Sequence, residues 1–93
     1  MFLKEKNKFK EYLLNLNYYG LEGIDILKCP TKTFENSEYE CIYNALMEIY
    51  ETEEEYFETH EFNSCIFNDF NEEFRNAISK SLNYLDNLEY LEA

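Results

Sequence analysis

The sequence has few of the residues that build metal sites, disulfides and turns. Its three cysteines, Cys29, Cys41 and Cys65, are an odd number without a Cys-x-x-Cys pair, and His60 is the only histidine. Zinc needs more ligands than this, and the pattern is typical of reduced thiols in a reducing compartment. Both glycines and the one proline fall between residues 20 and 34. We expect no metal and no cofactor, and we expect residues 20–34 to be the least helical part of the chain.

Long apolar runs are also missing. No run approaches the roughly 18 residues that a membrane-spanning helix needs, and no signal-peptide pattern is visible. Residues with A/T-rich codons, such as Asn, Lys, Ile, Tyr and Phe, are frequent. These features predict a protein of the cytoplasm of a bacterial host cell.

Basic residues are scarce. The chain holds 20 acids and 8 bases, for a net charge of −12. The imbalance is confined to one part of the chain: residues 1–34 have six lysines and four acids, whereas residues 35–93 have two bases and sixteen acids. Such a field repels nucleic acid and anionic membranes, and it attracts basic protein surfaces. We therefore expect no direct nucleic-acid binding and no membrane binding, and a partner with a basic surface.

Catalytic motifs are absent from the sequence. There is no nucleophile elbow, P-loop or Gly-rich phosphate loop. His60 and Cys65 are five positions apart and would point to different faces of a helix. Phe57 stands where the Glu-x-x-His motif of helical di-metal sites needs a glutamate. The sequence predicts that this protein is not an enzyme.

Apolar side chains are plentiful enough for a folded core. Hydrophobic residues make up 45% of the chain and aromatic residues 18%, whereas disordered acidic tails lack such side chains. A length of 93 residues allows one domain at most. We predict a single domain over residues 1–93 with a mainly α fold, a compact bundle of three to five helices.

Apolar periodicity places these helices along the chain. Residues 2–17 form the first, ended by Gly20, and the capping box that begins at Ser37 starts a second that runs to about Tyr50. Thr52 repeats the capping pattern, so either a third helix begins there or one helix runs straight through.

The strongest apolar stripe covers residues 62–92. Phe62, Ile66, Phe70, Phe74, Ile78 and Leu82 step by four, and Leu85, Leu88 and Leu91 follow at steps of three. This pattern predicts either a single helix or a nearly coaxial pair divided at Asn71, which could act as an N-cap.

Residues 23–34 leave two alternatives open. Ile24 and Ile26 alternate with Asp25, which is a short-strand pattern, and Pro30 could turn the chain back. A small β-hairpin at 23–34 would make the fold α+β, and the alternative is an irregular linker.

Six glutamates crowd residues 49–62, with no lysine or arginine among them. Glu53, Glu54 and Glu55 suit the first turn of a helix. On a helix, however, Glu51, Glu54, Glu55, Glu58 and Glu61 share one stripe, and their like-charge neighbours cost about 1–2.5 kcal/mol together. Since a typical stability is about 5–15 kcal/mol, this cost points to a function for the stripe.

A basic groove is the natural partner of such a stripe. Carboxylates that advance about 5 Å per helical turn are comparable in scale to a row of phosphates. Interleaved aromatic side chains would supply apolar anchors. The candidate partner-binding residues are Glu51, Glu54, Glu55, Glu58, Glu61, Asp69, Glu72, Glu73, Tyr50, Tyr56 and Phe57.

In its short length, strong acidity and lack of catalytic motifs, the sequence resembles the small acidic inhibitors of phages and mobile elements, the anti-CRISPR and DNA-mimic proteins. The resemblance is compositional and covers residues 35–93 best. It implies an inhibitor that occupies the basic DNA- or RNA-binding groove of a CRISPR effector or another nucleic-acid-binding defence enzyme. The alternatives are an immunity protein that neutralises a nuclease toxin and a helical protein–protein adaptor, and the apolar stripe of residues 62–91 could also mediate a homodimer.

Overall fold

The structure, a computed structural model, describes residues 2–29 and 37–92, with side chains for 6–29 and 37–87. Its elements in chain order are α1 (Phe2–Tyr19), η1 (Gly20–Glu22), α2 (Gly23–Ile26), α3 (Ser37–Thr59) and α4 (Ser64–Glu92). No strand occurs among the described residues. The prediction of a mainly α bundle is confirmed.

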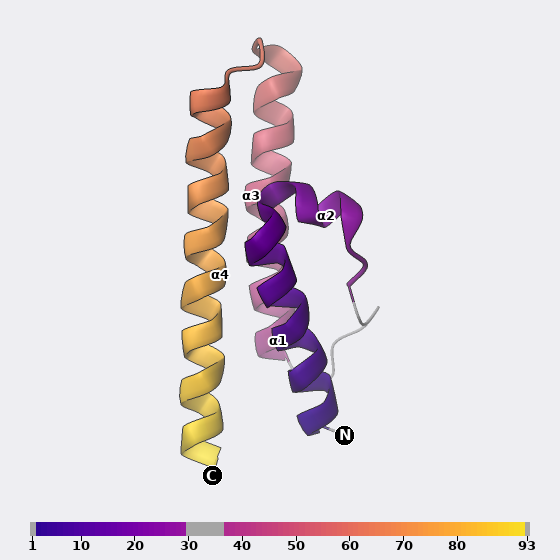
Figure 1. Ribbon diagram of the computed structural model, residues 1–93, viewed down its shortest axis with the longest axis vertical. Coiled ribbons are helices and arrows are strands. Elements are labelled where there is room, and N and C mark those ends of the chain that lie inside the picture. The colour runs from indigo at the N-terminus through magenta and orange to yellow at the C-terminus, as the bar shows by residue number, and fades with distance from the viewer. Residues whose placement is uncertain (1, 30–36, 93) are drawn as a thin grey trace.

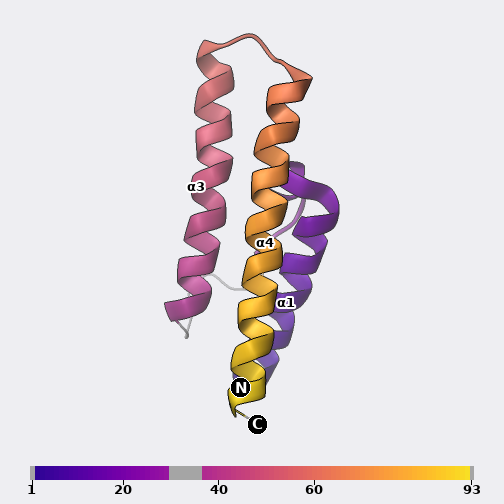
Figure 2. The ribbon, with the colours of Figure 1, turned by 90° about the vertical axis from the view of Figure 1, so that its left-hand side faces the viewer.

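The bundle is built on a long antiparallel hairpin. Helices α3 and α4 run side by side over most of the molecule, and α1 lies along only the part that is distant from the hairpin turn (Figures 1 and 2). The extents are 48 × 23 × 19 Å and the radius of gyration is 14.2 Å, against roughly 12 Å for a compact domain of this length. The molecule is elongated because the hairpin turn projects beyond α1.

The core lies where the three long helices meet. Helix α4 packs against both α1 and α3, while α1 and α3 meet through aromatic rings. The rings of Phe9 and Tyr39 stack with centroids 5.1 Å apart, and those of Tyr12 and Tyr43 lie 6.5 Å apart. The buried hydrophobic side chains are those of Phe9, Tyr12, Leu13, Leu16, Leu21, Tyr39, Leu46, Phe74, Ile78 and Leu85.

The side chains of the apolar stripe predicted over residues 62–92 become more exposed towards the hairpin turn. Phe74 and Ile78 are 0% exposed, Phe70 is half-buried, and Phe62 is 66% exposed. The gradient follows the reach of α1, because α1 covers only the buried part of the stripe (Figure 1).

Gly20 makes the sharp turn that ends α1. Its φ is +73°, in the left-handed region that favours glycine, and a Cβ there would lie 2.5 Å from Oδ1 of Asn71. The same Oδ1 accepts a hydrogen bond from the N–H of Leu21 (2.8 Å). Arg75 donates to the last carbonyls of α1, those of Asn17 and Tyr18. Asn71 therefore makes a tertiary contact and does not cap a helix. Of the two alternatives, a single helix or a nearly coaxial pair, the single helix is correct.

The predicted β-hairpin at 23–34 is wrong for the described residues. Gly23–Ile26 form α2, residues 27–29 contain no strand, and residues 30–34 lie outside the described part of the chain. Ile24 and Leu27, three positions apart, pack on the core, whereas Ile26 is 60% exposed. The apolar pattern thus follows a helical period. Gly23 fits here because a Cβ would lie only 3.0 Å from a methyl of Leu16.

The predicted helix start at Thr52 is also wrong, because α3 continues from Ser37 to Thr59. The Thr52 hydroxyl donates to the carbonyl of Glu48 (2.8 Å), so the helix itself satisfies it. The cap that begins α4 is Asn63, whose Oδ1 accepts from the N–H groups of Cys65 (2.9 Å) and Ile66 (3.2 Å). Phe62 therefore precedes the helix and lies in the connection over residues 60–63.

Candidate functional site

The exposed face of α3 carries a row of glutamates. Because α3 is unbroken, Glu51, Glu54, Glu55 and Glu58 share this face, and all four are exposed. None of the four forms an ion pair with a described residue. Residues 37–63 contain nine glutamates and no lysine or arginine. We call Glu51, Glu54, Glu55 and Glu58 the acidic row.

Glu61 does not belong to this row. It is exposed, but α3 ends at Thr59, so Glu61 lies in the connection between the helices. The prediction of a five-residue helical stripe is wrong at this position. Four like-charge pairs remain within the acidic row, at a cost of about 1–2 kcal/mol.

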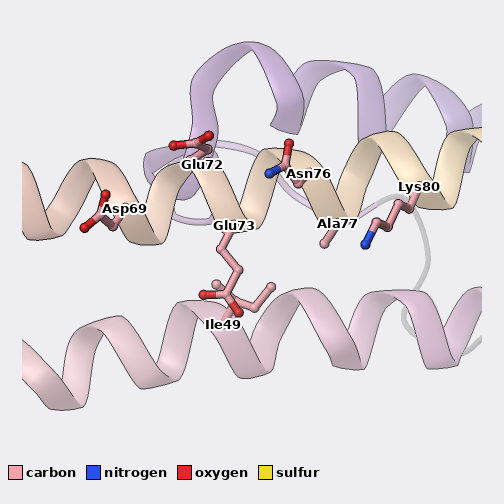
Figure 3. Close-up of a pocket in the computed structure, with 7 residues that line it drawn as sticks. All are labelled: Ile49, Asp69, Glu72, Glu73, Asn76, Ala77 and Lys80. Carbon is pink, nitrogen blue, oxygen red and sulfur yellow. The ribbon is translucent and has the colours of Figure 1, made fainter.

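The predicted acids of α4 line a groove between α3 and α4, to which α3 contributes Ile49 and no member of the acidic row. It has a volume of about 500 Å³ and contains one basic side chain, that of Lys80. In Figure 3, Glu73 points from α4 towards Ile49 of α3, with Asp69 and Lys80 on either side along α4. The lining residues are Ile49, Asp69, Glu72, Glu73, Asn76, Ala77 and Lys80.

A second groove, which we call the α2–α3 groove, borders the acidic row at Glu54. Its volume is about 330 Å³ and its lining contains no lysine or arginine. It is lined by Leu21, Glu22, Asp25, Tyr50, Glu53, Glu54 and Phe67. Sequence reasoning missed Glu22 and Asp25, because they lie in the lysine-rich part of the chain and only the turn after α1 brings them to α3.

Hydrogen bonding and burial set the chemistry of the α2–α3 groove. The Tyr50 hydroxyl donates to Oδ1 of Asp25 (2.5 Å), and this bond, together with one to Glu54, raises the pKa of the Tyr50 phenol. Burial raises the pKa of the Glu53 carboxyl, and the nearby charges of Glu54 and Asp25 raise it further. The groove thus holds negative charge close together without a cation to balance it.

The three predicted aromatic contact residues are all half-buried. Tyr50 is bonded to α2, as described above. Tyr56 stacks on His60 with ring centroids 4.1 Å apart, and Phe57 contacts Phe62 at 5.3 Å. These rings therefore pack within the protein and leave only part of their surface for a partner.

One lysine of α1 supplies counter-charge to α4. Lys10 forms an ion pair with Asp86 of α4 (2.6 Å). This pair balances one acid of α4, but it leaves the acidic row and the α2–α3 groove without an ion pair to a described residue.

The part of the chain that the structure describes has neither a metal site nor a membrane-spanning helix. No group of three or more His, Cys, Asp or Glu side chains there is arranged to hold a metal ion. No helix there is long and apolar enough to cross a membrane. Comparisons with protein-family models, curated proteins and solved structures find no match to this chain.

Proposed function

We propose that this protein is an inhibitor that binds the basic nucleic-acid-binding groove of another protein and excludes the nucleic acid. The observation that supports the proposal is the acidic row, with the acid-lined α2–α3 groove beside it and no ion pair to a described residue. The repulsion within the row opposes folding, because neighbouring like charges on a helix are destabilising. A basic groove would remove that repulsion.

The spacing of the row favours a groove built for phosphates. Side chains on one face of α3 advance by about 5 Å per turn over the length of the row. Proteins hold nucleic-acid phosphates with lysines and arginines at comparable intervals, and the affinity of such contacts falls steeply with salt. In the class of inhibitors that the sequence resembles, the target would be a CRISPR effector or another nucleic-acid-binding defence enzyme.

The test is displacement of labelled DNA or RNA from purified candidates: guide-loaded CRISPR effectors, restriction enzymes and nuclease toxins. We expect the protein to displace nucleic acid from its target, and we expect this inhibition to weaken about tenfold or more between roughly 0.05 M and 0.2 M salt. Binding without displacement would indicate an immunity protein, and binding that salt does not weaken would indicate an adaptor. Either result overturns the proposal.

Charge reversal locates the contact. In the α3 reversal variant, Glu55→Lys and Glu58→Lys, we expect inhibition to fall at least about tenfold, since each residue faces a phosphate-binding cation. Glu54 is left unchanged because it also bonds to Tyr50. The α1 control variant, Asn7→Lys, Glu11→Lys and Asn15→Lys, alters the net charge equally at exposed positions of α1. Equal inhibition by the two variants would show that total charge, and not the row, carries the effect.

A further inference from the structure

The end of the α3–α4 hairpin lacks a third helix. Arg75 of α4 contacts the end of α1 and Asn71 contacts η1 directly after it, so the first turns of α4, from Ser64 onward, extend beyond α1. At a rise of 1.5 Å per residue, the distance along the helix from residue 64 to residue 71 is about 10 Å. Figure 1 shows this part of the hairpin standing clear of α1.

Three phenylalanines gather on the uncovered part. Phe57 of α3 and Phe67 of α4 both contact Phe62 of the connection, with ring centroids 5.3 and 5.9 Å apart. Phe62 is 66% exposed, whereas Phe74, about two turns beyond Phe67 along α4 and part of the core, is 0% exposed. Phe57 and Phe67 are half-buried, so Phe62 is the exposed ring of the group, and exposed apolar surface that continues over neighbouring rings is typical of interaction sites. We call Phe57, Phe62 and Phe67 the phenylalanine cluster.

The connection that carries Phe62 is held in place from both sides. On the α3 side, the His60 ring stacks on Tyr56 and its Nδ1 lies 3.0 Å from the Tyr56 carbonyl oxygen. On the α4 side, Asn63 caps the helix through two N–H groups. Phe62 is therefore presented on an ordered turn, which lowers the entropy lost on binding.

The negative charge beside the phenylalanine cluster limits the kinds of partner that can bind there. Phe67 also lines the α2–α3 groove, whose acids are Glu22, Asp25, Glu53 and Glu54. A second copy of the chain would bring its own charge of −12 against this surface, and anionic lipids would be repelled in the same way. A cationic segment with apolar side chains is complementary to both the rings and the groove.

We infer that the phenylalanine cluster is a docking site for a cationic protein segment whose apolar side chain covers Phe62 while an arginine or lysine enters the α2–α3 groove. The inference rests on the proposed function in taking the partner to be a basic protein, and it adds the apolar anchor. The raised pKa of Glu53 agrees with a groove that lacks a cation.

Short peptides test this surface directly. The probe is acetyl-Lys-Leu-Arg-Leu-Lys-amide, and its controls are the same peptide with glycine in place of both leucines and an acidic peptide with glutamate in place of its basic residues. In a two-dimensional NMR titration we expect the probe to shift the amides around Phe62 and Phe67 and around Glu53. The glycine control should bind at least fivefold more weakly, and the acidic control should not bind.

Two variants give the matched comparison. Phe62→Ala should weaken probe binding at least fivefold, and it should fold normally because the ring is largely exposed. Tyr18→Ala removes another exposed aromatic ring, 78% exposed on α1, and should leave binding within twofold of wild type.

The inference is wrong if no probe binds, if the shifts fall elsewhere, or if Phe62→Ala binds as tightly as Tyr18→Ala. Each of these results would leave the proposed function standing, because nucleic-acid displacement through the acidic row does not need the cluster. Conversely, probe binding without nucleic-acid displacement would support the docking site and refute the proposed function.

Discussion

The carboxyl group of Glu53 is destabilised in its charged form by its position in the α2–α3 groove. Unlike the acids of the row, it is half-buried, and it shares the α2–α3 groove with Asp25 and Glu54. Loss of water and two nearby negative charges both disfavour its charged form, so the pKa of the Glu53 carboxyl is raised above the ordinary value of 4.5. At neutral pH this residue therefore opposes folding.

The linked prediction concerns pH. Because the pKa of Glu53 is higher in the folded than in the unfolded chain, the folded state binds the proton more tightly. Protonation of Glu53 therefore stabilises the folded state. This stabilisation is complete below the pKa that Glu53 has in the unfolded chain, and it is lost as the pH rises through the pKa that Glu53 has in the folded chain. We expect Glu53→Gln to raise the melting temperature at pH 7.5 and to lose this advantage near pH 4.5, followed by circular dichroism.

Glu55→Gln is the control for this experiment. Glu55 is exposed on the same helix, so its substitution should change the melting temperature less and with a weaker dependence on pH. An equal gain in the two variants would show that general repulsion, and not the surroundings of Glu53, governs the effect.

At the scale of whole elements, the long helices could be predicted from the sequence and the short connections could not. The apolar period of α1 and of α4 is long enough to define each helix, and Gly20 ends α1 as expected. In α2 the same reasoning failed, because three residues with alternating polarity fit a strand and a helical turn equally well. Only packing against α1 decides between them, and that contact is tertiary.

The residues that cap helices could not all be predicted from the sequence either. Thr52 has the local pattern of an N-cap, yet its hydroxyl bonds to Glu48 within α3, while Asn63 is the residue that caps α4. Short polar side chains serve both roles, and the length of the apolar face decides which one they take. The pattern Asn63-Ser64 before the apolar run was present in the sequence and would have placed the start of α4 correctly.

The cap of α4 carries the prediction at this scale. Asn63→Ala removes an acceptor for two N–H groups, so we expect the free energy of unfolding to fall by about 0.5–2 kcal/mol. Asn63→Asp should retain most of the stability, since aspartate is an equally good N-cap. Asn68→Ala, at an exposed position within α4, should change stability by less than about 0.5 kcal/mol. Urea unfolding measures all three, and equal losses at 63 and 68 would contradict the role of the cap.

For the whole molecule, the sign of the charge and its location along the chain could be predicted from the sequence. The grooves and clusters of the charged surface could not. The exposure of Glu51, Glu55 and Glu58 follows from a helical period opposite the core. The α2–α3 groove does not follow, because it joins acids from the two differently charged parts of the chain. The phenylalanine cluster likewise depends on where α1 ends relative to the hairpin turn, which is set by the contacts of Asn71 and Arg75.

Salt should stabilise this protein. Its net charge is −12, and the glutamates of the acidic row repel one another without ion pairs to described residues. The Debye length falls from about 10 Å at 0.1 M salt to about 3 Å at 1 M, so added salt screens this repulsion. We expect the melting temperature to rise with sodium chloride, which avoids the separate effect of sulfate on apolar burial.

The two charge variants identify the source of that salt effect. The α3 reversal variant and the α1 control variant have equal net charge, so a difference between them reports on where the charge lies. Because lysines at 55 and 58 place opposite charges beside Glu51 and Glu54, we expect the α3 reversal variant to be more stable at low salt and to gain less from added salt. Equal responses would mean that the acidic row costs the fold nothing, and the physical reason for assigning it to a basic partner would then be lost.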